Sequence, residues 1–412
     1  MSPTTRPVVL VTAFACDPRL PSEPTIGWEY LLTWLAITEE HDLDVVFVMN
    51  ERSRAATEER LHADGRDTAQ LTIISPPEPR WSRFLRHHRL TRFEHLVWGW
   101  RTPAAVRRVL DTRRIVLARH VTFASELLPA PITWLSDRAF TVWGPVGSTG
   151  RADAYLYEPR PTDWRRRYLV QRLRDLLSTV LARRTGRRVS LSLVTSSALA
   201  DRMRAVRAVA RVFPNTRPIA ARRADADGED RRRDGIVVLS VGNLVPLKRI
   251  ELAVAALTVP ELATAQLRVA GKPAPGRPND LSGLARRLGV DDRVQFLGQI
   301  PREDVVREMH AADVLVHLSA REGGSGVVGE ATSVGLPVVT FDGTGAAAVL
   351  EYSGAPGVTV PKTAPRTIRS IAAAVVEAAA LPHEPSTVWT AERLLETERD
   401  LFREALRRAG GQ

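Results

Sequence analysis

Short apolar runs alternate with helix-patterned segments twice along this chain of 412 residues, and no other feature limits its fold as strongly. Apolar runs without polar alternation predict strands that are buried on both faces of a parallel sheet. Parallel strands need crossover connections, which the intervening helices supply. The sequence therefore predicts an α/β fold with two doubly wound domains. The expected strands are 8–14, 44–49, 71–75, 116–122, 141–143 and 191–195 in the first series, and 236–241, 266–270, 294–297, 314–318 and 337–341 in the second.

A polar segment separates the two series. Residues 216–234 are highly charged and almost free of large apolar side chains, as is typical of a linker. We therefore expect an N-terminal Rossmann-like domain at 1–215 and a C-terminal one at 235–385. The remaining residues, 386–412, contain an amphipathic helix pattern at 392–408. The chain thus divides into two domains, a linker and a terminal helix.

Composition limits the cellular setting. Cys16 is the single cysteine, so the chain can form no internal disulfide and no cysteine-based zinc cluster. No apolar run approaches the roughly 18 residues that are needed to span a bilayer. The run at 8–14 is short and is followed by Asp17 and Pro18, so it fits a first strand better than a signal peptide. These features predict a cytoplasmic protein.

The formal net charge of +11 raises the question of a nucleic-acid partner. The sequence has no helix-turn-helix, zinc or RNA-binding signature, and we expect no nucleic-acid partner. The charge is concentrated in 83–101 and 164–188, where arginines mix with aromatic and leucine residues at helical spacing. Such basic amphipathic helices suit an anionic membrane surface, an anionic acceptor or a partner protein. Alternatively, their apolar faces pack on the N-terminal sheet and leave the arginines in solvent, which we favour because Arg167 interrupts a narrow apolar face.

The stretch from Glu322 to Glu330 combines a glycine-rich turn with two carboxylates. The preceding run, 313–319, predicts a buried strand, and the apolar spacing after Gly326 predicts a helix. The backbone amides of such a turn lie at the positive end of a helix, where phosphate and sugar oxygens can dock. Carboxylates only accept hydrogen bonds, so Glu322 and Glu330 could hold hydroxyl groups on either side of a bound phosphate.

Lysine is rare in this chain. Only Lys248, Lys272 and Lys362 occur, and the remaining basic charge is carried by arginine. Lys248 follows the strand expected at 236–241, in a loop that opens a helix. A lysine ammonium is a compact charge that can sit between phosphates. We therefore predict that Lys248 binds a phosphate group.

The Glu-x7-Glu spacing, with Gly323, Gly324 and Gly326 in the turn, resembles the signature of retaining glycosyltransferases of family 4. The resemblance implies the GT-B architecture, in which an N-terminal acceptor domain faces a C-terminal nucleotide-sugar domain across a cleft and the last helix crosses back to the N-terminal domain. It also implies that Glu322 holds hydroxyls of the donor sugar and Glu330 the ribose. The implied phosphate contacts are Lys248 and the backbone of Gly324, Ser325 and Gly326.

The resemblance also shows departures at the donor site. Asn243 stands where the family has an arginine that binds the donor diphosphate, and Arg249 is a candidate substitute. The loop containing Gly298 and Gln299 would contact the base through its backbone, so it does not separate uracil from guanine donors. Thr344 replaces a glycine near the donor, and Ala348 replaces an acidic residue.

Two N-terminal motifs resemble one branch of the same family. Residues 22–28 are similar to its Ser-Glu-Pro-Gly-Val-Gly-Trp loop, which implies that Gly27 meets the donor diphosphate, although Thr25 replaces the first glycine. Residues 119–123 are similar to its His-His-Val-Thr-Phe segment. This implies that His120 faces the cleft near the reacting sugar, whereas Arg119 departs from the first histidine.

These observations predict a retaining glycosyltransferase that moves a sugar from a nucleotide diphosphate sugar to a hydroxyl acceptor. The expected catalytic residues are His120, Lys248 and Glu322, with no metal and no cofactor, and a UDP-sugar is favoured over a GDP-sugar as donor. Asp225-Ala226-Asp227 spells a metal-binding motif but lies in the linker rather than at a strand end.

Several alternatives stay open. The acceptor is either a small molecule or a lipid-linked sugar, the latter with peripheral contact to the inner membrane face. The chain could instead be another GT-B enzyme, such as a sugar-nucleotide epimerase or a phosphorylase. A non-catalytic binding protein with a degenerate donor site would suit the substitutions at Asn243, Thr344 and Ala348.

Overall fold

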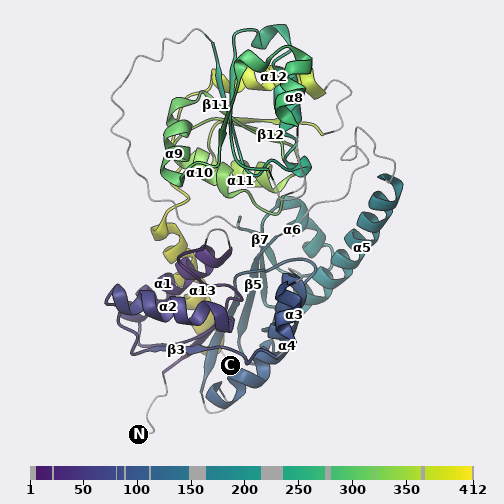
Figure 1. The fold of residues 1–412 in the computed structure, drawn as a ribbon. Helices are drawn as coiled ribbons and strands as arrows, with labels where there is room; N and C mark the ends of the chain where they lie inside the picture. The colour runs from purple at the N-terminus through teal and green to yellow at the C-terminus, as the bar shows by residue number, and fades with distance from the viewer. Residues whose placement is uncertain are drawn as a thin grey trace. The chain divides into compact units, whose positions relative to one another are not determined.

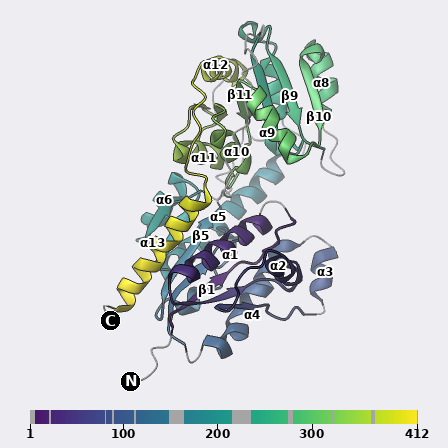
Figure 2. The same ribbon diagram turned by 90° about the vertical axis from the view of Figure 1, so that its left-hand side faces the viewer.

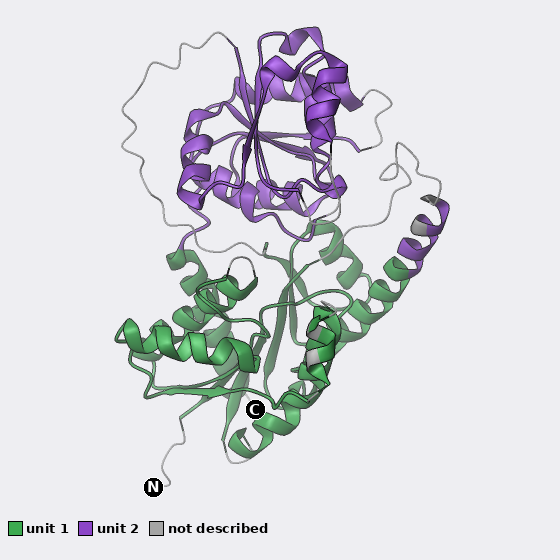
Figure 3. Ribbon diagram, in the orientation of Figure 1, with its two compact units in different colours: residues 1–148, 174–218, 391–412 green, residues 149–173, 219–390 purple. Residues whose placement is uncertain are grey.

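The structure is a computed structural model that describes residues 6–20, 23–79, 81–87, 90–110, 113–147, 164–214, 235–273, 280–320, 322–362 and 367–410. The expected linker and its Asp225-Ala226-Asp227 motif lie outside these residues. The chain forms two compact units, and each is described by itself. Unit 1 holds residues 1–148, 174–218 and 391–412, and unit 2 holds 149–173 and 219–390 (Figure 3).

Unit 1 contains a seven-stranded sheet in the order β3-β2-β1-β4-β5-β6-β7, and all of its strand pairs are parallel. Valine, leucine and isoleucine fill the strands, as expected where helices cover both faces. The strands are β1 (Val8–Thr12), β2 (Asp44–Val48), β3 (Leu71–Ile74), β4 (Ile115–His120), β5 (Phe140–Val146), β6 (Leu191–Val194) and β7 (Ala210–Val212).

Helices cover both faces of this sheet (Figure 1). On one face, α1 (Glu23–Glu40) and α13 (Ala391–Gly410) pack on a core that includes Trp34 and Phe402, and α13 lies along α1 (Figure 2). The opposite face is covered by α4 (Thr91–Leu110), α5 (Trp164–Arg188) and α6 (Ser197–Arg204). The remaining helices are α2 (Glu51–Ala63) and α3 (Ser82–His87).

Unit 2 contains a six-stranded parallel sheet in the order β10-β9-β8-β11-β12-β13. Its strands are β8 (Val237–Val241), β9 (Gln266–Ala270), β10 (Val294–Gly298), β11 (Val314–His317), β12 (Val338–Phe341) and β13 (Gly357–Val360). One face carries α7 (Ile250–Ala256), α8 (Leu281–Leu288) and α12 (Thr367–Ala379), and the other carries α9 (Arg302–Ala311), α10 (Gly326–Ser333) and α11 (Gly345–Ser353).

The structure confirms the predicted α/β class with two doubly wound sheets, and it confirms that the last helix packs on the N-terminal sheet. Each predicted strand is present, with differences of a few residues at its ends. Two edge strands, β7 and β13, were not predicted. Both are very short, and an edge strand needs little apolar patterning because only part of it is buried. Among the described helices, none is both long enough and apolar enough to cross a membrane.

Candidate active site

Two loops of unit 2 leave neighbouring strands at the point where the strand order reverses. β8 and β11 lie side by side although they are the first and fourth strands of this unit. Open α/β sheets bind ligands in the crevice at such a switch point. Lys248 lies in the 3-10 turn Pro246–Lys248 after β8, and Glu322 lies in the loop after β11. The structure therefore joins the two residues that the sequence marked independently.

Both oxygens of the Glu322 carboxylate have partners. Lys248 Nζ donates to Oε1 at 2.7 Å, and His317 Nε2 lies 2.5 Å from Oε2. Burial raises the pKa of Glu322, but the hydrogen bonds and charges of His317 and Lys248 outweigh burial and lower this pKa to about 2. The carboxylate is therefore ionised at neutral pH and can only accept hydrogen bonds. This is the state in which it could hold sugar hydroxyls.

His317 is a site residue that the sequence analysis did not single out. It ends β11 with its side chain buried, and its Nε2 also lies 3.2 Å from Ser325 Oγ. The same hydroxyl caps α10 by accepting from the Val328 amide at 3.4 Å. The side chain of Ser325 is thus used within the protein, and its predicted role falls to its backbone. A histidine at a strand end, five residues before the glutamate, is the signal that could have revealed this contact.

The start of α10 is open. A Cβ atom built on Gly326 would meet no heavy atom within 4 Å, and the first amides of a helix lack intrahelical acceptors. Behind the turn, Gly345 donates its amide to the Glu322 carbonyl at 3.1 Å. A Cβ atom on Gly345 would lie 2.4 Å from that oxygen and 2.8 Å from the Gly324 nitrogen. Gly345 therefore packs directly against the turn, which leaves the opposite side accessible to an anion.

The second carboxylate of the motif has a different environment. Glu330 lies on α10, and Arg302 Nη2 at the start of α9 is 3.2 Å from its Oε1. Burial raises the pKa of Glu330, and the charge and hydrogen bond of Arg302 oppose this shift. Arg302 is a second residue that the sequence analysis missed. Its signal is weak, because the two side chains come from different helices and no spacing links them.

The structure also shows where the residues lie that differ from the family pattern at the donor site. Asn243 is exposed in the loop after β8; Gly298, the last residue of β10, and Gln299, which follows it, are also exposed. Arg249 adopts a left-handed conformation, with a φ of 52°, between the 3-10 turn and α7. Its side chain is buried, and its Nε donates to Glu251 at 2.5 Å. This pairing compensates its charge and makes Arg249 a poor substitute for the cation that Asn243 lacks.

His120 occupies the corresponding switch point of unit 1, where β1 and β4 are neighbours. Its Nδ1 lies 2.9 Å from Thr12 Oγ1 and 3.1 Å from the Thr12 carbonyl oxygen. The Thr12 hydroxyl donates to the Arg119 carbonyl at 3.2 Å, so Nδ1 is the ring nitrogen that carries the hydrogen. Burial, followed by the neighbouring His95, lowers the pKa of His120 well below its ordinary value. His120 is therefore a neutral imidazole, 1% exposed, whose Nε2 keeps a lone pair.

Arg119, which replaces the first histidine of the resembling motif, has a structural role. Its guanidinium is fully buried and donates to the Glu398 carboxylate of α13 at 3.1 and 3.2 Å. It also donates to the Tyr30 hydroxyl at 3.3 Å and lies over the Tyr30 ring. The departure at Arg119 thus ties β4 to the terminal helix rather than presenting a polar group to a ligand.

The loop expected to end at Gly27 is shorter than predicted. Helix α1 begins at Glu23, so Gly27 lies inside the helix rather than before it. A Cβ atom on Gly27 would lie 2.0 Å from the Ala15 carbonyl oxygen, which explains the glycine by packing. Glu23, which the sequence analysis did not single out, accepts from the Phe123 amide at 2.9 Å. It joins this segment to the loop after β4, beside His120.

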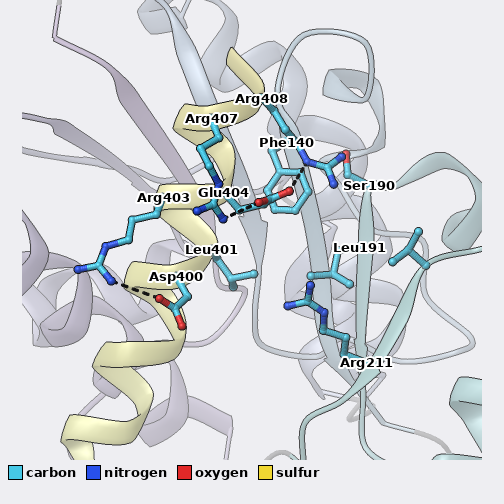
Figure 4. Close-up of a pocket in the computed structure, with 11 residues that line it drawn as sticks. Phe140, Ser190, Leu191, Arg211, Asp400, Leu401, Arg403, Glu404, Arg407 and Arg408 are labelled. Carbon is cyan, nitrogen blue, oxygen red and sulfur yellow. Dashed lines mark hydrogen bonds and ion pairs between the residues drawn. The ribbon is translucent and has the colours of Figure 1, made fainter. Parts of the chain in front are cut away.

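A cavity of about 370 Å³ in unit 1 lies away from the switch point of this unit. Residues at the starts of β5, β6 and β7 line it together with α13 (Figure 4). The amino ends of the strands form the edge of the sheet opposite to the carboxyl ends, where Lys248, Glu322 and His120 are found in their respective units. The cavity is therefore separate from His120, and Arg403, Arg407 and Arg408 in its lining pair with carboxylates of the same helix.

Comparison with known proteins gives a family match for the part that holds Lys248 and Glu322. Residues 222–385 match the model of glycosyl transferases group 1. The D-inositol 3-phosphate glycosyltransferase of Mycobacterium sp. (strain KMS) is 38% identical over 106 residues. This match covers 25% of the chain and 24% of the relative. The chain thus matches about a quarter of the length of this curated relative.

Solved structures match almost the whole chain at low identity. Sucrose-phosphate synthase from Thermosynechococcus elongatus is 18% identical with a TM-score of 0.59, covering 97% of this chain and 99% of that one. Anabaena Alr3699/HepE in complex with UDP is 16% identical with a TM-score of 0.53, covering 98% and 100%. At these identities the likeness shows the fold alone, and the fold is GT-B: two Rossmann-like domains, as predicted.

Proposed function

We propose that this protein is a glycosyltransferase that moves a sugar from a nucleotide diphosphate sugar to a hydroxyl acceptor, with retention at the anomeric carbon. The observation that carries the proposal is the cluster of Lys248, Glu322 and His317 at the switch point of unit 2, next to the open start of α10. The group 1 family match over residues 222–385 supports the same activity.

The donor would lie on unit 2. Lys248 and the amides at the start of α10 would hold the diphosphate, because an ammonium and a helix N-terminus both attract phosphate oxygens. Glu322, ionised and held by two donors, would accept from hydroxyls of the sugar, and Glu330 would accept from the ribose. A UDP-sugar is the favoured donor, since the similar protein HepE is described in complexes with UDP.

The chemistry would depend on fixed charges. Negative charge develops on the diphosphate as the bond to the sugar breaks, and prearranged donors stabilise it without reorganisation. In this proposal Lys248 and the α10 amides supply that stabilisation and no metal is needed. His120 would act on the acceptor side as a neutral group whose Nε2 accepts from a hydroxyl. The protein would work in the cytoplasm.

A donor screen followed by product analysis tests the proposal. Thermal unfolding would be followed with UDP, GDP and their hexose derivatives, because a ligand at 100 times its Kd stabilises a protein by about 2.7 kcal/mol. The donor that binds would then be incubated with candidate acceptors, with chelator or with magnesium, and the anomeric configuration of the product read by NMR.

Each result of that screen has a distinct meaning. Transfer with retention in the presence of chelator would support the proposal. A changed sugar nucleotide that forms without an acceptor would instead indicate an epimerase. Donor binding with neither sugar transfer nor slow hydrolysis of the donor would indicate a non-catalytic binding protein.

A further inference from the structure

Helix α5 exposes its apolar face and buries small and polar residues, whereas a helix that packs on a core buries its apolar face. Leu169, Leu173, Leu176 and Val180 follow one another at spacings of four, three and four residues, so they form one stripe. All four are exposed, and Leu169 is 70% exposed. The side that is buried against unit 1 carries small or polar residues instead, namely Ser178, Ala182 and Thr185. The expectation that the apolar face of this segment packs on the N-terminal sheet is therefore wrong.

The segment with α3 and α4 also exposes large apolar side chains. Trp81, Phe93 and Trp100 are each more than half exposed, and Trp100 reaches 80%. Together, residues 81–110 and α5 contain 13 of the 20 large apolar side chains that are exposed in the described part of the chain. An apolar surface that is concentrated in this way marks an interaction site rather than ordinary surface composition.

These two segments also carry the positive charge of the protein. Residues 81–110 contain seven arginines and one glutamate, and residues 164–188 contain nine arginines and one aspartate. Their net charges are +6 and +8, whereas the whole chain has +11, so the other residues together have a net charge of −3. The basic character is thus local, and it coincides with the exposed apolar side chains.

Residues 81–110 and the part of α5 that belongs to unit 1, residues 174–188, lie on one side of the sheet of unit 1. Trp98 of α4 and Ala182 of α5 belong to the same core cluster, which packs on a single face of that sheet. Figure 1 shows α3, α4 and α5 together on that side. The exposed surfaces of α3, α4 and residues 174–188 of α5, here called the basic apolar surface, are therefore available to one partner.

We propose that the basic apolar surface docks on an anionic lipid bilayer. Leucine and tryptophan side chains would enter the region between head groups and acyl chains, while the arginines contact lipid phosphates. A second copy of the chain fits less well, because two segments of +8 would face each other across the apolar stripe. An anionic surface is the partner that satisfies both the charge and the apolar stripe.

Sedimentation of the full chain with lipid vesicles tests this proposal. Vesicles of equal parts phosphatidylglycerol and phosphatidylcholine should bind the protein, and vesicles of phosphatidylcholine alone should not. Binding should fall sharply at about 0.5 M salt, where the screening length shortens to a few ångströms. Absence of binding to the anionic vesicles at low salt, or equal binding to both kinds, would overturn the proposal.

A charge variant and a matched control locate the surface. Arg183, Arg184 and Arg188 are exposed on α5, and their joint replacement by glutamine should lower the partition coefficient roughly a hundredfold, at about fivefold for each basic residue. The control removes the same charge from Arg66, Arg286 and Arg369, which are exposed elsewhere. Equal losses in the two variants would contradict the assignment.

Tryptophan fluorescence gives a second readout that does not depend on affinity. Trp81 and Trp100 are exposed, whereas Trp28, Trp34 and Trp143 are buried. Lipids brominated on the acyl chain should quench the bound protein, and Trp81→Phe with Trp100→Phe should remove most of the quenching. Unchanged quenching in this double variant would exclude the basic apolar surface as the docking site. A stable dimer that does not bind vesicles would assign the stripe on α5 to a second copy instead.

Discussion

Arg119 of β4 and Glu398 of α13 form a fully buried ion pair, although they lie 279 positions apart in the chain. The guanidinium Nε reaches both carboxylate oxygens, at 3.1 and 3.2 Å. The same guanidinium donates to the hydroxyl oxygen of Tyr30 of α1 and lies over the Tyr30 ring. The pair therefore fixes the terminal helix on the sheet of unit 1.

Removal of one partner of this buried ion pair should lower the free energy of unfolding. Glu398→Ala leaves a charged guanidinium without its counter-ion, and such changes destabilise proteins by about 3–5 kcal/mol. Urea unfolding would measure the loss. Glu396→Ala on the same helix removes an exposed carboxylate and should change stability by less than about 1 kcal/mol. Similar effects of the two substitutions would contradict the structural role of the pair.

Two glycines should respond in opposite ways to alanine. Gly27→Ala places a Cβ atom against the Ala15 carbonyl oxygen, so it should destabilise unit 1 by about 1–3 kcal/mol. Gly326→Ala meets no atom and should leave the melting temperature unchanged or raised. If a ligand phosphate docks at the start of α10, Gly326→Ala should nevertheless weaken UDP binding in calorimetry. Unchanged UDP affinity in this variant would argue against that docking position.

The sequence identified the parts of the site that local patterns encode. Lys248 and Glu322 each follow a buried strand and precede a helix, so their loops could be placed at a sheet edge before their contact was seen. His317 and Arg302 were missed because their partners are defined by the packing of separate elements. The buried face of α5 was predicted wrongly, because we expected its apolar stripe to face the core.

Because of Glu322, the free energy of unfolding should depend on pH in the acidic range. Its pKa is about 2 in the folded protein and 4.5 ordinarily, so the ionised state is favoured by folding. This contribution is complete above pH 4.5 and is lost as the pH falls toward 2; its upper limit is about 3 kcal/mol. Urea unfolding of wild type and Glu322→Gln between pH 6 and the lowest pH at which both fold would measure it. Parallel curves for the two proteins would contradict the lowered pKa.

Asn243 offers a gain-of-function test. It is exposed after β8, and Arg249 is engaged with Glu251, so the site has room for another cation near Lys248. Asn243→Arg should tighten UDP or GDP binding by roughly tenfold, as expected for one charge-assisted hydrogen bond. Calorimetry with both nucleotides would measure the change, and Asn243→Gln is the neutral control. An equal Kd for the two variants would mean that the loop is not at the diphosphate.

The central claim is that Lys248 and Glu322 form a nucleotide diphosphate site, and UDP calorimetry on Lys248→Ala tests it most directly. A charge-assisted contact contributes about 1.5–3 kcal/mol, so Kd should rise roughly tenfold to a hundredfold. Arg286→Ala serves as the control, because Arg286 is exposed near the end of α8, away from the loops that hold Lys248 and Glu322. Both titrations are run in excess chelator. The account predicts weak binding in Lys248→Ala and wild-type binding in Arg286→Ala, and a wild-type Kd in Lys248→Ala would contradict it.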